Sequence, residues 1–363
     1  MRSGGTYPQT VSDPNALGPG SANGRAVDNT LRENRRSSPF LRWLAGAWSW
    51  LFLVFMVLFF EIWARSAYGA TFLLNPTNLQ SILLAAVQPL LLALGQTLVI
   101  IAGGIDLSVG FTVGLAAVVS ARIMQNFDSS LPVALSFALA CGVALLAALG
   151  VGAVNAFLVA RLNVPPFIGT LGMYGVARGL GFLTSAGNTV PTDNPLNSAM
   201  GNGFLLGLIP IPVLITAVVV LIMHYLLSQT KFGQYTYAIG GNRQAAVRAG
   251  INVTRHTMQL YLITALLAGI AGIIYTGRFT AGAAQAGEAT LLDSIAAVVI
   301  GGASLFGGAG TIVGTVIGAL IIAVIQFGLV FINVQPFWQF IAVGLVIILS
   351  VLVDQSKARV VKP

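Results

Sequence analysis

The sequence has few charged residues and almost no cysteine. Charged side chains occupy 8% of the 363 positions and hydrophobic ones 56%, whereas about 25% charged residues is usual for a soluble domain. Cys141 is the only cysteine, which excludes a disulfide framework and a cysteine metal site. No Gly-Lys pair occurs, so the chain cannot bind ATP through a P-loop. These absences indicate an integral membrane protein that is not itself a P-loop ATPase.

Patterns of catalytic residues are also lacking. We find no nucleophile paired with a base and no His/Asp/Glu cluster, so we expect no metal, no cofactor and no enzymatic activity. The net charge of +8 comes from Lys and Arg in short hydrophilic segments between apolar runs and not from one basic face. The charge therefore predicts membrane topology and excludes nucleic acid as a partner.

The apolar runs are long enough to cross about 30 Å of hydrocarbon as helices of about 20 residues. They lack the alternation of a membrane β-barrel. We therefore expect an all-α fold, a polytopic transmembrane helical bundle in contact with membrane lipid. The apolar runs suggest about ten spans, at 43–64, 79–102, 106–124, 132–160, 166–184, 210–228, 258–277, 291–305, 311–332 and 336–353.

Both termini are predicted to lie in the cytoplasm. Residues 1–42 have too few large apolar side chains to fold, so we expect a disordered tail, followed by a transmembrane domain at 43–354 and a C-terminal tail at 355–363. An even number of spans places both tails on one side of the membrane. Basic residues favour the cytoplasmic side, and of the 18 Lys and Arg residues all fall on the side of the tails except Arg65, Arg122, Arg178 and Arg278.

The run Leu94–Gly114 is apolar, breaks at Gly103 and Gly104, and restarts through Asp106 and Ser108. An acid in a membrane span is costly, and a double glycine lowers helix propensity. If Asp106 begins the next helix, its carboxylate can accept the free N–H groups there and lie at the positive end of the helix dipole. Direct contact with a substrate is the alternative.

A second broken stretch has the same pattern. Aligning Gly103 with Gly301 also matches Gly104, Leu107 and Gly110 with Gly302, Leu305 and Gly308. Paired, glycine-broken helices beside the substrate path are common in transporters. Close helix packing through small residues is the alternative explanation.

The hydrophilic segment Lys231–His256 is predicted to contain a two-turn helix outside the membrane. Asn242 is placed to cap a helix through Arg243, Ala246 and Arg248, and Gly250 is placed to end it. This helix is either an interfacial connector whose arginines meet lipid headgroups or the docking site of a soluble partner. The longer loop at about 185–209 has a similar ambiguity, as a surface for an external partner or as an inert connector.

Three stretches resemble the ribose-type sugar permeases of bacterial ABC importers: Leu94–Gly110, Ala238–Val253 and Leu292–Gly318. The resemblance covers about residues 75–355 and includes the order of the three motifs. It implies a permease subunit of the inner membrane that pairs with a second permease, a copy or a sibling. Two cytoplasmic ATP-binding subunits would drive it, and a periplasmic binding protein would deliver a monosaccharide or related polyol. The family's coupling helix, which docks on the ATPase, matches Gly241, Asn242, Arg243, Ala246, Arg248 and Gly250.

A sugar path needs hydrogen-bonding groups, because a sugar is neutral and covered in hydroxyls. The same polar residues could instead join neighbouring helices. The candidates are Gln88, Gln96, Thr97, Asp106, Ser108, Asn155, Thr170, Tyr174, Gln326 and Asn333. A rival hypothesis is an ion-coupled secondary transporter that works alone, with Asp106 and a buried Arg178 as its coupling charges.

Overall fold

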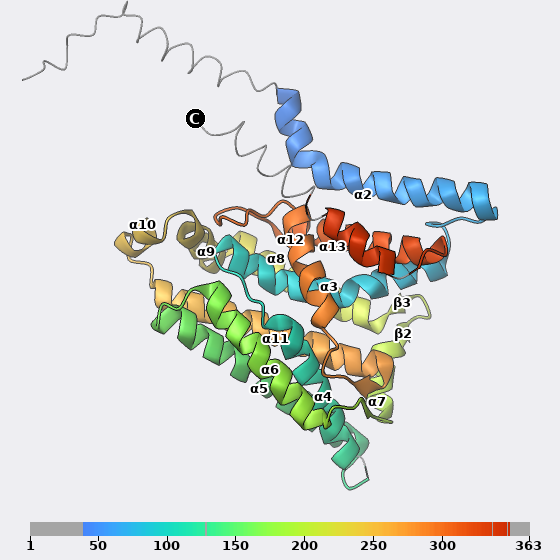
Figure 1. Ribbon diagram of the computed structural model, residues 1–363, viewed down its shortest axis with the longest axis horizontal. Helices are drawn as coiled ribbons and strands as arrows, with labels where there is room; N and C mark the ends of the chain where they lie inside the picture. The colour runs from blue at the N-terminus through green and yellow to red at the C-terminus, as the bar shows by residue number, and fades with distance from the viewer. Residues whose placement is uncertain (1–38, 128, 336, 347, 349–363) are drawn as a thin grey trace, which may run out of the picture. The chain divides into compact units, whose positions relative to one another are not determined.

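The computed structural model describes residues 39–127, 129–335, 337–346 and 348 (Figure 1). The chain divides into two units, and the account below concerns residues 48–354. The predicted tails at 1–42 and 355–363 lie outside the described residues, apart from positions 39–42, where the first helix has already begun.

The described residues form a bundle of helices. The predicted spans correspond to helices from α2 to α13, and the tenth, at 336–353, is helical at 337–346 and only partly described. The long helices are α2 (Pro39–Tyr68), α3 (Pro76–Ile101), α4 (Val109–Phe127), α5 (Val133–Ala156), α6 (Pro166–Ser185), α8 (Ile211–Gln229), α11 (Val253–Phe279), α12 (Glu288–Ile300) and α13 (Ile312–Phe331). The shorter elements are the π-helical turn η2 (Phe157–Arg161), α7 (Pro195–Asn202), α9 (Lys231–Gly241) and α10 (Arg243–Arg248).

Helix starts follow local sequence signals. Asn75 accepts the N–H of Thr77 and Pro76 opens α3, while Pro166 opens α6. Proline is suited to the first turn because its missing N–H has no partner there. Among the described residues, six helices are long and apolar enough to cross a membrane, namely α2, α3, α5 with η2, α8, α11 and α13. The protein is thus a polytopic helical membrane protein, and the span count of about ten stays a prediction.

The core of the bundle lies around α3. The most apolar stretch of α3 is 83% buried, whereas that of α2, at the periphery, is only 11% buried. Helix α3 packs against α8, α11, α12 and α13. Helix α11 packs in turn against α4 and α5, and α5 and α6 lie side by side (Figure 1). The broken segments predicted from sequence therefore join the most buried helices.

The two ends of the bundle are built differently. We name them the α10 end, where α11 begins, and the α7 end, where α11 finishes. At the α7 end, β1 (Val190–Pro191) pairs antiparallel with β4 (Ala281–Gly282), and β2 (Phe204–Leu205) pairs with β3 (Ile209–Pro210). The loop at 185–209 is therefore ordered, with α7 between β1 and β2, and β1 ties it to the chain that leaves α11.

Glu61 and Arg65 form the ion pair typical of residues four apart on a helix, with 2.7 Å between Arg65 Nε and Glu61 Oε1. The other carboxylate oxygen of Glu61 accepts the N–H groups of Phe72 and Leu73 at 2.8 and 2.9 Å. One acid thus joins the end of α2 to the turn before α3.

Candidate functional site

The short helix predicted in the Lys231–His256 segment is present with the predicted bounds. Asn242 accepts the N–H of Ala245 at 2.9 Å and caps α10, and Gly250 ends it with φ of +81°. Ala246 is buried against Ile239 and Val253, whereas Arg243 and Arg248 are exposed. Helix α10 thus has one face anchored to the bundle and an exposed face that carries the two arginines.

Helix α9 joins α10 to both broken stretches. A side chain at Gly240 would overlap the carbonyl oxygen of Ile101, at the end of α3, and would stand 2.6 Å from the N–H nitrogen of Gly308. The N–H of Gly308 itself donates to Ile101 O at 2.8 Å. Tyr237 in α9 donates its hydroxyl to Gly310 O at 2.7 Å, and burial raises the pKa of that hydroxyl, which keeps it protonated. The three segments therefore meet with backbone against backbone.

Both breaks end the preceding helix with the same backbone geometry. Gly103 has φ of +82° and Gly302 has φ of +90°, values that glycine adopts readily and other residues rarely do. Gly301 is the C-cap of α12 and has a φ of -67°, and Ala102, the C-cap of α3, likewise has a negative φ, so Gly103 corresponds to Gly302 and not, as predicted, to Gly301. The same pair of N–H donations closes each helix: Gly103 to Ile100 and Gly104 to Val99 in α3, and Gly302 to Val299 and Ala303 to Val298 in α12.

Asp106 lies in a buried hydrogen-bond network that holds the start of α4. Its Oδ1 accepts the Ser108 N–H at 2.9 Å and the Ser108 hydroxyl at 2.6 Å. Asn155 on α5 donates to Ser108 Oγ at 2.8 Å, and Gln96 on α3 donates to the Asp106 carbonyl oxygen. Helix α4 begins at Val109, later than the predicted residue 106, because Asp106 turns the chain before the first helical residue.

The other predicted path residues lie in two different settings. Thr97 on α3 and Thr315 on α13 share a hydrogen bond of 2.6 Å, and Tyr174 packs edge-on against Phe111 with ring centres 4.6 Å apart. Gln326, in contrast, lines a pocket of about 200 Å³ toward the α7 end. The structure thus brings Gln96, Asp106, Ser108 and Asn155 together and places Gln326 elsewhere.

The α7-end pocket joins two predicted path residues, Gln88 and Gln326, to polar groups that were not among the predicted path residues. Gln326 donates to Asp293 Oδ2 at 2.9 Å, and Gln88 also lines the pocket while donating to Ala286 O at 2.8 Å. Tyr275, Arg278 and Thr290 complete its polar lining. Its charged members, Asp293 in the middle of α12 and Arg278 at the end of α11, belong to different helices, so nothing associated them before the helices were packed.

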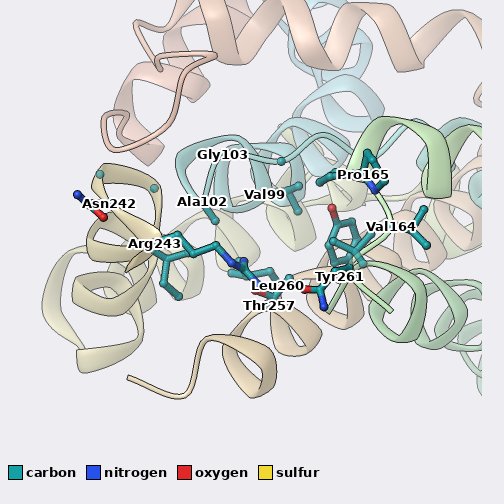
Figure 2. Close-up of a pocket in the computed structure, with 17 residues that line it drawn as sticks. Val99, Ala102, Gly103, Val164, Pro165, Asn242, Arg243, Thr257, Leu260 and Tyr261 are labelled. Carbon is teal, nitrogen blue, oxygen red and sulfur yellow. The ribbon is translucent and has the colours of Figure 1, made fainter. Parts of the chain in front are cut away.

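A larger cavity of about 420 Å³ opens at the α10 end (Figure 2). It lies between the α3–α4 break at Gly103 and Gly104, the start of α10 at Arg243, and the first turns of α11 at Thr257 and Tyr261. The sequence analysis missed Thr257 and Tyr261. Their spacing of four residues, which places both on one helix face, was the signal that could have found them.

Arg178 is exposed on α6 and not buried, as the sequence had suggested. Helix α6 lies at the edge of the bundle, where it packs against α4 and α5. The Arg178 guanidinium lies over the rings of Phe111 and Phe182, with its carbon 5.3 and 5.9 Å from their centres. It is therefore not joined to Asp106 inside the bundle.

Comparisons with known proteins agree with the resemblance seen in the sequence. The family model described as "Branched-chain amino acid transport system / permease component" matches residues 78–351. The ribose import permease of Bacillus subtilis is 39% identical over 307 residues, covering 84% of this chain and 92% of that protein. The fructose import permease of Rhizobium meliloti is 38% identical, covering 80% of this chain and 78% of that one.

A galactose/methyl galactoside import permease of Haemophilus influenzae is 34% identical and covers 84% of this chain and 94% of its own length. A probable ABC transporter permease of Sinorhizobium fredii is 37% identical, covering 78% and 83%. No solved structure matches the chain significantly. The family match extends from α3 through α13, and these relatives each cover more than three quarters of the chain, so the chain belongs to the permease family of ABC importers that includes the ribose import permeases.

Proposed function

We propose that this permease moves a monosaccharide or related polyol across the bacterial inner membrane, toward the cytoplasm. The names of its relatives include ribose, fructose and galactose permeases. The α7-end pocket supplies amides, hydroxyls and one acid, groups that donate and accept hydrogen bonds from sugar hydroxyls. We place Gln326 and Asp293 on the sugar path, with Gln96, Thr97, Asp106, Ser108, Asn155 and Tyr174 holding the helices beside it.

The observation that carries the proposal is the contact of α9 with both broken stretches. A partner that pushes on the exposed face of α10 would move α9. Because Gly240 has no side chain, the backbone of α9 contacts Ile101 and Gly308 directly and would move them with it. ATP-binding subunits docked on α10 could therefore move both breaks together. Alternating access would follow from rocking of one part of the bundle against another.

This mechanism requires a defined orientation of the protein in the membrane and further partner proteins. The basic residues at the α10 end, including Arg243, Arg248 and Arg255, favour the cytoplasm for that end and for both termini. The α7 end then faces the periplasm, where its ordered loop at 185–209 offers a surface to a sugar-binding protein. A second permease, a copy or a sibling, would cover helices such as α6 whose apolar faces are exposed in one chain.

Reconstituted uptake tests the energy source. We expect labelled sugar to enter proteoliposomes only when the ATP-binding subunits, the binding protein and ATP are all present. Uptake by this chain alone that an uncoupler collapses would instead establish an ion-coupled transporter. The relatives favour the importer, since they are named import permeases and an ABC transporter permease.

Charge reversal on α10 tests the docking site. The double change Arg243→Glu and Arg248→Glu should separate ATP hydrolysis from uptake, because it opposes a docked partner without touching the buried Ala246. Arg161→Glu, an exposed arginine at the end of η2, is the matched control and should retain coupling. Normal uptake by the double variant, at normal membrane levels, would remove α10 from the mechanism.

A further inference from the structure

We propose that the cavity at the α10 end is a binding site for a small polyhydroxylated anion, of which a sugar phosphate is the simplest. The site is distinct from the α7-end pocket, with which it shares no lining residue. The proposal goes beyond transport itself. It rests on the proposed function in two respects, namely that the α10 end faces the cytoplasm and that the transported molecule is a sugar.

Two buried hydroxyls in the cavity have no hydrogen-bond partner. Tyr261 is 1% exposed and Thr257 is 6% exposed, and neither Tyr261 Oη nor Thr257 Oγ1 is bonded to another group of the described chain. Buried hydroxyls are normally paired, because an unpaired one loses its bonds to water without replacement. Both lie on one face of α11, so a single ligand could satisfy them.

The break lies directly against the Tyr261 hydroxyl, at the wall of the cavity. A side chain at Gly104 would stand 3.1 Å from Tyr261 Oη, and Figure 2 shows this hydroxyl directed away from α11 toward the break. At about 420 Å³, the cavity falls in the usual range of about 300–1,000 Å³ for small-molecule sites. A phosphorylated pentose or hexose is of suitable size.

The charge of the cavity selects an anion. Arg243 is the only charged residue that lines it among the described residues, and no acid does. Figure 2 shows the Arg243 side chain directed from the start of α10 toward the part of α11 that carries Thr257. A guanidinium binds phosphate oxygens through paired N–H donors. Arg243 would hold the phosphate, and the hydroxyls of Thr257 and Tyr261 would meet the sugar.

A ligand in this position would bridge three segments that must move during transport. It would contact the α3–α4 break, the start of α10 and the first turns of α11, and so would favour one arrangement of the three. Such a ligand slows uptake, because it stabilises one state of the cycle over the others. A kinase reaction that phosphorylates the imported sugar in the cytoplasm would supply it, which makes the site one of product feedback.

Thermal unfolding of the purified full-length chain in nanodiscs tests the site without transport. Ribose 5-phosphate and fructose 6-phosphate are the probes, with ribose and inorganic phosphate at equal concentrations as controls. We expect saturable stabilisation by at least one sugar phosphate and much weaker effects of the two controls. Absence of stabilisation by both sugar phosphates, or equal stabilisation by ribose, would overturn the proposal, and neither result would bear on uptake driven by ATP.

Removal of the two hydroxyls gives the sharpest test. Tyr261→Phe and Thr257→Val should leave the unliganded melting temperature unchanged or raise it, since each deletes an unpaired buried hydroxyl. Each should nevertheless weaken sugar phosphate binding about fivefold. Tyr225→Phe, at an exposed tyrosine of α8 outside the cavity, is the matched control and should bind normally. Unchanged affinity in both cavity variants would overturn the proposal.

Arg243→Gln tests how much the phosphate group contributes to binding, apart from the sugar. We expect affinity for the sugar phosphate to fall on the order of 10- to 100-fold, as for a lost hydrogen bond to a charged group. Affinity that is unaffected by Arg243→Gln would contradict an anion site and would indicate that the cavity only releases neutral sugar.

Discussion

The α3–α4 break and the α12–α13 break have the same backbone geometry, at Gly103 and Gly302, and are held in place by different means. Buried side chains from α3 and α5 hold the first around Asp106. The second is a tight turn in which the Ser304 N–H donates to Ala309 O at 3.0 Å. Tyr237 of α9 holds this turn by donating its hydroxyl to Gly310 O. The first break is thus fixed from within the bundle, and the second is fixed by the segment that carries α10.

This difference gives the two breaks separate roles, although their backbone geometry is the same. A displaced α9 would move the second break directly through Gly308 and Gly310, whereas the first would be moved at the end of α3 while the Asp106 network keeps its shape. Three predictions test this contrast, in decreasing order of expected effect.

Asp106→Leu should lower the free energy of unfolding by about 3 kcal/mol or more, because two buried donors on Ser108 lose their acceptor. Asp106→Asn should cost less than about 1 kcal/mol and retain most uptake, since an amide oxygen also accepts the Ser108 N–H and hydroxyl. Thermal unfolding in detergent, with uptake measured in parallel, compares the two. A well-folded but inactive Asp106→Asn variant would show that the carboxylate contacts sugar.

Gly240→Ala should destabilise the protein by about 1–3 kcal/mol, as overpacking does, and should reduce uptake by forcing α9 away from Ile101 and Gly308. Gly241→Ala is the matched control, because a side chain there meets nothing within 4 Å; its effect should stay within about 0.5 kcal/mol. Equal effects of the two substitutions on stability and on sugar uptake would show that α9 does not press on the breaks.

Gly103→Ala and Gly302→Ala should each cost about 1–2 kcal/mol, the usual penalty for alanine in a left-handed conformation. A side chain meets nothing within 4 Å at either position, so the backbone conformation alone sets the cost and the two values should agree. The same melting experiment measures both. A clear inequality would mean that the breaks are not equivalent even in their backbone.

Local signals predicted α10 well because its determinants are adjacent in sequence. Asn242, three residues from the N–H that it accepts, and Gly250, with its positive φ, define that helix without help from the rest of the fold. The helical class and the positions of most helices followed from the length of the apolar runs for the same reason. The family resemblance likewise depended on continuous motifs, and the relatives confirmed it.

Predictions from the sequence were wrong or incomplete where the position of a residue depends on how the helices pack. Arg178 was expected inside the bundle, but a sequence does not show which helix lies at the edge. Asp293 and Gln326 come from different helices and meet only after α12 packs on α13, so their pairing carried no local signal. Tyr261 and Thr257 look like ordinary polar residues of a span until the break at Gly104 is placed beside them.

Helix α11 is unbroken, whereas α3 and α12 end in glycine turns. Its 27 residues reach about 40 Å at 1.5 Å per residue, from the cap beside α10 to the chain that pairs with β1. The last turn of α7 packs against the far end of α11, since a side chain at Gly201 would overlap the backbone of Gly277. A single unbroken helix therefore connects the two ends of the bundle, where we propose that the partners dock. If a periplasmic protein shifts this helix by binding, thermodynamic reciprocity requires that ATPase docking alter the affinity for that protein by the same factor.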